Sequence, residues 1–140
     1  MASQLRLQIV SADRSLVDDL VDEVEIPGAK GYFGVLPGHT PLLAQLGTGE
    51  LWYRTGQHVE YLAICFGFAE VQPDRVSILA EIAERASDID VARAEAAKHR
   101  AEELLAHPPG DMNYERARVA LMKALIRLQV AAHVSSRARQ

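Results

Sequence analysis

The histidines are the first residues to consider for chemistry, because the imidazole ring is a common general base and metal ligand near neutral pH. Five are present, at His39, His58, His99, His107 and His133. None is part of a His-Glu-x-x-His sequence, the spacing that places two metal ligands on one face of a helix. His39 can in principle act as a base, but it lies in the turn sequence Pro37-Gly38-His39-Thr40-Pro41. A histidine held in such a turn is more often a structural or interface residue.

Other catalytic patterns are equally lacking. The sequence has no Gly-x-Ser-x-Gly elbow, no Walker phosphate loop and no Gly-x-Gly-x-x-Gly fingerprint. The adjacent acids Asp18-Asp19 and Glu102-Glu103 have no neighbours suited to acid–base catalysis, so we predict that they are solvated surface. The single Cys65 lies in an apolar run and is expected to be a buried small side chain. We therefore predict a non-catalytic protein that requires no cofactor or metal.

Basic residues near the C-terminus form the more informative pattern. Arg93 and Arg100 are seven residues apart and would share one face of a helix. Arg116, Lys123 and Arg127 recur with similar spacing further along the chain. If the two segments fold together, the two stripes can converge on a polyphosphate. Ordinary solubilising charge is the simpler explanation of the same spacing.

The elements that would position these residues are of two kinds, and residues 1–86 show the period of two that is typical of half-buried strands. Apolar and polar side chains alternate at 5–9, 23–26 and 75–78. Turn sequences lie between such runs, at 27–28, 37–38, 47–49, 55–57 and 72–74. Short strands with a turn about every 8–12 residues predict a β-sandwich or barrel of mostly antiparallel strands.

The remaining residues change to the period of a helix. The segment 91–106 has neither Gly nor Pro and is rich in Ala, Glu, Lys and Arg, which favour helices. Ser87 or Asp88 is predicted to cap its start, with Asp90 completing an acidic variant of the capping box. Residues 107–110, His-Pro-Pro-Gly, end the helix because proline cannot continue it.

A second helix is predicted from near Asp111 or Asn113 to about Val134, and the short connection implies an antiparallel hairpin. Alanines dominate the two stripes that would face each other, at Ala94, Ala97, Ala101 and Leu104, and at Tyr114, Ala117, Leu121, Ala124, Leu128 and Ala131. Alanine buries little apolar area. The hairpin is therefore expected to be held weakly, to itself and to the sandwich, as a moving part would be.

The net charge of −4 is unevenly distributed. Residues 1–86 carry 6 basic and 12 acidic side chains, a net of −6, whereas residues 87–140 carry 9 and 7, a net of +2. A charge of +2 is too weak to indicate nucleic-acid binding. No apolar run approaches the roughly 18 residues of a membrane span, and the N-terminus lacks the pattern of a signal peptide. We expect a cytoplasmic protein that reaches a membrane only through its partners.

Three blocks of sequence carry the pattern of a known family. Residues 31–43, GYFGVLPGHTPLL, resemble the pattern Gly-x-x-Gly-(Ile/Val)-x-Pro-Gly-His-x-Pro-Leu of the epsilon subunits of bacterial F-type ATP synthases. Residues 67–80, GFAEVQPDRVSILA, form the second block, and residues 89–94, IDVARA, match the Ile/Leu-Asp-x-x-Arg-Ala that opens the family's helical domain. The matches run in order over about residues 4–134, and the first block is highly specific.

The resemblance implies a β-sandwich at 1–86 that binds the rotor and a regulatory helical hairpin at 87–140. Such a central-stalk subunit couples F1 to the c-ring together with the gamma subunit. Its hairpin can extend along gamma toward the alpha and beta subunits and block ATP hydrolysis. The interface residues that the resemblance implies are Tyr32, Pro37, Gly38, His39, Arg116, Lys123 and Arg127. Because some members carry an acid at the position of Tyr32, aromatic packing would replace a polar contact to the c-ring here.

In some members of this family the folded hairpin binds ATP, which favours the compact state. The resemblance places such a regulatory site at Glu84, Ile89, Asp90, Arg93, Ala94, Arg100, Lys123 and Arg127. Lys123 stands in the place of an arginine, so it keeps the charge but loses the bidentate fork that grips phosphate.

Two other hypotheses remain open. The chain could be a free-standing adaptor, with a ligand-binding sandwich and a protein-binding hairpin. An enzyme ranks third, because no nucleophile, base or metal constellation is present. Co-purification with a large membrane-bound ATPase would distinguish the rotor subunit from the adaptor.

Overall fold

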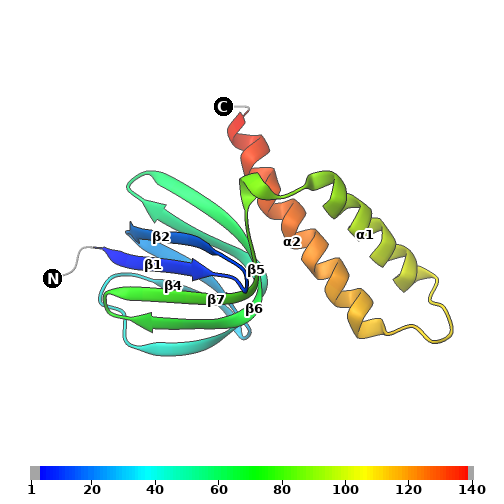
Figure 1. Cartoon of the computed structure of the whole chain (residues 1–140), viewed down its shortest axis with the longest axis horizontal. Coiled ribbons are helices and arrows are strands. Elements are labelled where there is room, and N and C mark those ends of the chain that lie inside the picture. The colour runs from blue at the N-terminus through cyan, green and yellow to red at the C-terminus, as the bar shows by residue number, and fades with distance from the viewer. Residues whose placement is uncertain (1–3, 139–140) are drawn as a thin grey trace. The chain divides into compact units, whose positions relative to one another are not determined.

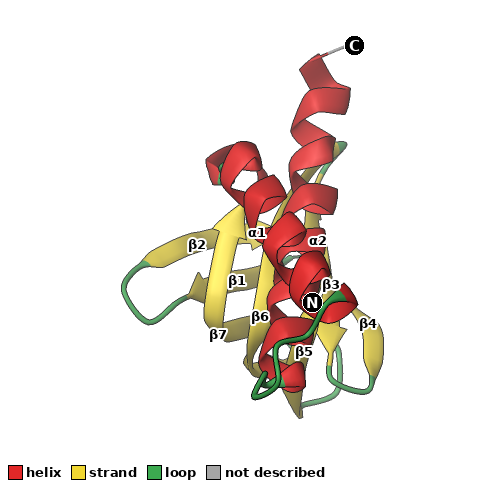
Figure 2. Cartoon of the chain, turned by 90° about the vertical axis from the view of Figure 1, so that its right-hand side faces the viewer, coloured by secondary structure: helices red, strands yellow, loops and turns green. Residues whose placement is uncertain are grey.

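The computed structural model describes residues 4–138, with side chains described as far as residue 134. The chain divides between Arg85 and Ala86 into two compact units, called here the sheet unit and the helical unit. Figure 2 separates them by colour, strands in the first and helices in the second. Each unit has its own pattern of buried residues, as the change of period near residue 86 predicts.

The sheet unit is a single seven-stranded sheet in the order β2-β1-β7-β6-β5-β3-β4. Its strands are β1 (Leu5–Val10), β2 (Ser15–Val21), β3 (Glu23–Gly28), β4 (Gly31–Val35), β5 (Leu42–Thr55), β6 (His58–Gln72) and β7 (Arg75–Arg85). Only β1 and β7 pair in parallel; the other neighbours are antiparallel. Figure 1 shows the sheet curving back on itself, and β2 contacts β5 across the interior. The predicted β-sandwich of mostly antiparallel strands is confirmed.

Period-two alternation accounts for the core. The apolar members of the three predicted runs are all buried: Leu5, Leu7 and Ile9 in β1, Val24 and Ile26 in β3, and Val76 and Ile78 in β7. Their polar neighbours point outward, because successive side chains of a strand face opposite sides. The inner faces of the curved sheet close over these side chains and make one continuous core.

One strand, β5, is longer than the turn signals predict. β5 has 14 residues and runs through 47–49, so the turn predicted at Gly47-Thr48-Gly49 is wrong. Glycine also occurs inside strands where another backbone or side chain approaches too closely for a Cβ atom. A Cβ on Gly49 would lie 2.4 Å from the Tyr32 hydroxyl oxygen. These glycines therefore mark a close approach within a strand and not its end.

A polar network ties the β2–β3 junction to the β5–β6 turn. Asp22, the residue between β2 and β3, accepts the Gly56 N–H at 2.6 Å and lies 3.4 Å from a guanidinium nitrogen of Arg54. Arg54 also donates to Glu23 at 2.8 Å. The hydrogen bond from Gly56 holds the pKa of the Asp22 carboxyl below its usual value, with smaller contributions from Gln4 and Arg54. The junction is thereby fixed with Asp22 in its charged form.

The helical unit begins with a short 3₁₀ turn, η1 (Ala86–Asp88), followed by α1 (Val91–Ala106) and α2 (Tyr114–Ala138). The predicted capping at Ser87 or Asp88 is wrong, because η1 occupies both residues. Asp90 is the N-cap instead, and its side chain accepts the Arg93 N–H at 3.0 Å. A 3₁₀ turn therefore occupies the predicted capping residues, and the cap lies at Asp90, directly before the predicted helical segment 91–106.

The second helix begins where the sequence predicts and ends later. Asn113 accepts the Arg116 N–H at 3.1 Å, which is the geometry of an N-cap. α2 continues to Ala138, past the predicted end near Val134. Residues 135–138 contain neither Gly nor Pro, so nothing in the local sequence stops the helix.

Alanines line the contact between the two helices. The buried residues of the pair include Ala94 and Ala101 on α1 and Ala117, Ala124 and Ala131 on α2, and we call these five the alanine seam. Leu104 and Tyr114 were also predicted to face the partner helix, but they are 41% and 59% exposed. Both lie beside the 107–113 connection, where the pair ends and a side chain has no neighbouring turn on one side. α1 and α2 form the antiparallel hairpin seen in Figure 1.

Candidate functional site

The 36–41 turn carries the predicted interface residues Pro37, Gly38 and His39 on a rigid support. The Gly38 N–H donates to the Pro73 carbonyl at 2.7 Å, which ties this turn to the β6–β7 turn. The His39 N–H donates to the Leu36 carbonyl at 3.2 Å. Gly38 has φ of 89°, a conformation that a residue with a side chain rarely adopts. The turn is therefore fixed from two directions.

The His39 ring takes part in this turn. Its Nδ1 lies 2.6 Å from the Thr40 carbonyl oxygen. A carbonyl can only accept, so Nδ1 carries the proton of this hydrogen bond. The ring is half-buried, and its hydrogen bond is to backbone and not to a carboxylate or hydroxyl. This is the geometry of a residue that helps to hold a turn, and an interface role for His39 stays a prediction.

Tyr32 lies on β4, the edge strand that leads into the turn. Its side chain is 54% exposed, as an interface residue should be in the isolated chain. Its hydroxyl accepts the backbone N–H of Glu50 at 3.0 Å. The sequence predicts aromatic packing of Tyr32 at an interface and does not reveal this bond, because the two residues are 18 positions apart.

The basic residues of the two predicted stripes lie on one side of the alanine seam. Arg93 and Arg100 each precede a buried alanine of α1, and Arg116 and Lys123 each precede a buried alanine of α2. The residue before each buried alanine points about 100° away from that alanine about the helix axis. Because the two helices are antiparallel, these preceding residues lie on the same side of the seam on both helices. Arg127 lies on that side too, and it is half-buried like Lys123.

Three other residues of the predicted nucleotide site have structural roles in the folded hairpin. Ile89 and Ala94 are buried, with Ala94 only 3% exposed, so neither offers a free surface to a purine ring. Asp90 uses one carboxylate oxygen as the cap of α1. Glu84 belongs to β7 in the sheet unit, whereas the others belong to the helical unit. Within the helical unit, the charged members of the set are the ones within reach of a ligand.

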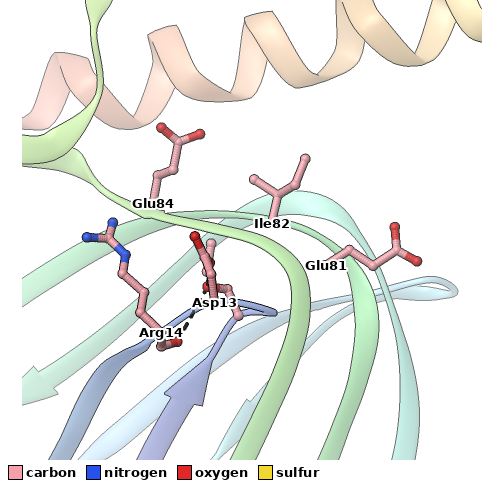
Figure 3. A pocket seen from close by; sticks show the side chains of 7 residues that line it. Asp13, Arg14, Glu81, Ile82 and Glu84 are labelled. Atoms are coloured by element: carbon pink, nitrogen blue, oxygen red, sulfur yellow. Dashed lines mark hydrogen bonds between the residues drawn. The ribbon is translucent and has the colours of Figure 1, made fainter.

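Two shallow hollows lie on the surface of the described residues. Figure 3 shows the one on the sheet unit, lined by Ser11, Asp13, Arg14, Glu81, Ile82, Ala83 and Glu84. Its three acids outnumber its one arginine, so the net negative charge of the lining would repel a phosphate group. The other runs along α2 and is lined by Asn113, Glu115, Arg116, Val119, Ala120 and Lys123. The predicted interface cations Arg116 and Lys123 therefore lie beside the apolar side chains of Val119 and Ala120, as their helical spacing requires.

Metal-binding geometry is not found in the part of the chain that the structure describes. No group of three or more His, Cys, Asp or Glu side chains among these residues could hold a metal ion. No helix in the same range is long and apolar enough to cross a membrane. The fold and its surface define a class: a small β-sandwich with a rigid turn at 36–41, followed by a cationic helical hairpin.

Comparisons with known proteins identify the family within this class. Residues 4–86 match the family described as "ATP synthase, Delta/Epsilon chain, beta-sandwich domain", and residues 87–132 match its "long alpha-helix domain". The chain belongs to the ATP synthase delta/epsilon-chain family. The ATP synthase epsilon chain of Syntrophobacter fumaroxidans is 48% identical over 94% of this chain and 98% of the relative. That of Geobacter metallireducens is 45% identical over 94% and 96%. These are non-catalytic subunits of the complex, and so is this chain.

Solved structures show the same fold. A chain of the Euglena gracilis mitochondrial ATP synthase structure described as "OSCP/F1/c-ring in rotational state 1" superposes with a TM-score of 0.70 at 23% identity, covering 99% of this chain and 83% of the other. A chain of the Tetrahymena thermophila structure described as "central stalk/cring" gives 0.54 at 10% identity, covering 95% and 98%. At these identities the likeness concerns the fold alone.

Proposed function

We propose that this chain is a rotor subunit that joins gamma to the c-ring and restrains ATP hydrolysis through a mobile helical hairpin. It would act at the cytoplasmic face of a bacterial plasma membrane, held there by its partners. Its relatives at 44–50% identity are ATP synthase epsilon chains from bacteria, which supports that setting. The observation that carries the regulatory part is the alanine seam.

The seam supports mobility because each of its residues contributes a single methyl group. Burying one methyl or methylene is worth about 0.8 kcal/mol, against about 1.5–3 kcal/mol for a whole leucine side chain. The leucines at 121 and 128, which belong to the same stripe, are only half-buried. A contact built from such small groups can separate into a second state within a few kcal/mol, which is what a two-state switch requires.

The two units would have different partners. In the sheet unit, Tyr32 and the Pro37-Gly38-His39 turn would contact the c-ring and gamma, because that turn is rigid and its support is intramolecular. In the helical unit, Arg116, Lys123 and Arg127 would meet acidic surface on the alpha and beta subunits when the hairpin extends. Contacts of that kind weaken as salt is added.

The direct test of rotor membership is a chain that ends at residue 86. We expect residues 1–86 to fold and to bind a gamma–c-ring complex with the affinity of the whole chain within a few-fold, because every strand ends by Arg85. Binding is measured by surface plasmon resonance, with circular dichroism as the control for folding. A folded fragment that fails to bind would show that the helical unit carries the attachment. Recovery of the native chain outside any ATPase complex would favour the free-standing adaptor.

We also propose that the closed hairpin binds ATP as a regulatory ligand. Arg93, Arg100, Lys123 and Arg127 would face the phosphates, since they lie on one side of the seam. Glu84 and Asp90 would accept hydrogen bonds, and Ile89 and Ala94 would border the base after a local rearrangement that exposes them. ATP would then favour the closed state, because the two stripes face one ligand only when the helices are paired.

Calorimetric titration of the whole chain with ATP tests this site. We expect a Kd between micromolar and millimolar, since charge-assisted hydrogen bonds of about 1.5–3 kcal/mol are reduced by exposure. The double variant Arg93→Ala/Arg100→Ala should weaken binding at least tenfold. Arg118→Ala is the matched control, because Arg118 follows buried Ala117 and lies on the opposite side of the seam. Equal binding by the double variant would leave these arginines as contacts to other subunits.

A further inference from the structure

The hairpin of β3 and β4 joins the rest of the sheet through β5, and the pairing of β3 with β5 is interrupted in the middle. β3 pairs with β5 on both sides of residues 26–27, which lie opposite residues 47–51 of β5. Over the same stretch β5 keeps an unbroken register with β6, from Thr48 to Glu50. β5 therefore arches away from β3, and on that side its backbone lacks the regular partners of a ladder. A backbone N–H left there needs another acceptor.

Tyr32 supplies that acceptor from the far side of β3. It pairs with Pro27 across the β3–β4 ladder, and its side chain reaches Glu50 on β5. The 3.0 Å hydrogen bond from the Glu50 N–H to the hydroxyl replaces the missing ladder bond. Pro27 has no N–H, so β3 itself donates nothing at this position. One side chain thus connects β4 directly to β5.

Gly49 forms the surface on which the Tyr32 side chain rests. A Cβ at this position would lie 2.4 Å from the Tyr32 hydroxyl oxygen and 2.6 Å from the Pro27 Cβ. Both distances are shorter than real carbon contacts, so any side chain at 49 would displace the ring. The bare backbone of Gly49 and the ring of Tyr32 are complementary, and the bond to the next residue, Glu50, holds them in register.

We infer that Tyr32 is a positioning residue, which braces β4 and the turn after it against β5. β4 is an edge strand with β3 as its one neighbour. Without the brace, β4 would be linked to β5 only through the β3–β5 pairs on either side of residues 26–27. The turn at 36–39 follows β4 directly and carries the proposed rotor contact, so the purpose of the brace rests on the proposed function. The ring stays exposed while its hydroxyl is engaged inside the chain.

Hydrogen exchange of the Glu50 amide, followed by NMR on the whole chain, tests the brace. Tyr32→Phe removes only the hydroxyl and should accelerate exchange at Glu50 about three- to tenfold, as expected for losing one hydrogen bond. Gly49→Ala should do the same by displacing the ring. Tyr114→Phe, at a tyrosine of similar exposure on α2, should leave Glu50 unaffected. Unchanged exchange at Glu50 in both Tyr32→Phe and Gly49→Ala would overturn the brace.

Binding to the gamma–c-ring complex tests what the brace positions. At a temperature where all the chains are fully folded, Tyr32→Phe and Gly49→Ala should both bind several-fold more weakly than the native chain. Gly49→Ala keeps the tyrosine side chain and disturbs only its seat, so it separates positioning from loss of a direct contact by the hydroxyl. A role in stability alone would leave binding equal. Faster exchange at Glu50 with unchanged binding would refute the positioning role. If the native chain itself failed to bind, the proposed function would fall, and exchange at Glu50 would still decide whether the brace exists.

Discussion

Replacing Gly67 by alanine is expected to destabilise the sheet unit by at least about 3 kcal/mol. Gly67 lies within β6, between β5 and β7, and has φ of 118°, a region closed to residues with side chains. A Cβ there would lie 2.0 Å from the Leu79 carbonyl oxygen and 2.9 Å from the Ala80 Cα. Both are backbone atoms of the neighbouring strand, so neither can move aside without breaking the ladder.

The measurement is urea unfolding of the whole chain followed by fluorescence of the single Trp52, which lies in β5 and so reports on the sheet unit. Gly34→Ala is the matched control, since Gly34 is also in a strand, has no positive φ, and a methyl group added to it would meet no atom within 4 Å. That control should change the unfolding free energy by less than about 1 kcal/mol. A Gly67→Ala protein as stable as the control would show that β6 can straighten at this point.

Removing residues 87–140 is expected to raise ATP hydrolysis by the assembled enzyme several-fold and to leave ATP synthesis intact. The physical reason is that the helical unit carries the cationic face and the weak seam, whereas the sheet unit contains every strand. Deletion then removes the proposed restraint and keeps the proposed attachment. Hydrolysis should be measured on membranes and on detergent-released F1, with synthesis driven by an imposed proton gradient.

A second variant separates loss of charge from loss of the helices. Arg116→Ala/Lys123→Ala keeps the hairpin and removes two cations that line the hollow on α2. It should reproduce part of the increase in hydrolysis, with the difference from the native enzyme shrinking at high salt. Hydrolysis that stays at the native rate after deletion of the whole helical unit, on membranes and on released F1 alike, would refute the regulatory role.

Local patterns were sufficient wherever neighbours along the chain decide the structure. The bounds of α1 follow from helix-favouring residues at 91–106 and the prolines after it, and they agree with the structure. Alternation in β1, β3 and β7 predicted which side chains are buried. The alanine seam follows from helical spacing, because residues seven apart return to the same face. These signals depend on backbone preference and on the period of burial, which a single segment carries by itself.

Predictions were wrong where the same residue types fit more than one local structure. Ser87 and Asp88 are good capping residues, but the chain makes a 3₁₀ turn there and uses Asp90. Gly47 and Gly49 look like a turn, but they lie inside β5. Capping residues and glycines fit several local structures, so their type alone does not select one. Contacts with distant parts of the chain determine which of these local structures forms.

By itself, the sequence determined the class of protein: a sandwich, a helical hairpin, no catalytic constellation, and the blocks at 31–43, 67–80 and 89–94 that the family comparisons confirm. Only the tertiary structure decided how the presenting edge is held. The Tyr32–Glu50 bond and the Gly38–Pro73 bond each join segments far apart in the chain. The Gly67 conformation depends on the backbone of β7. Such contacts exist only after the sheet has curved and paired, so no local pattern of residues encodes them.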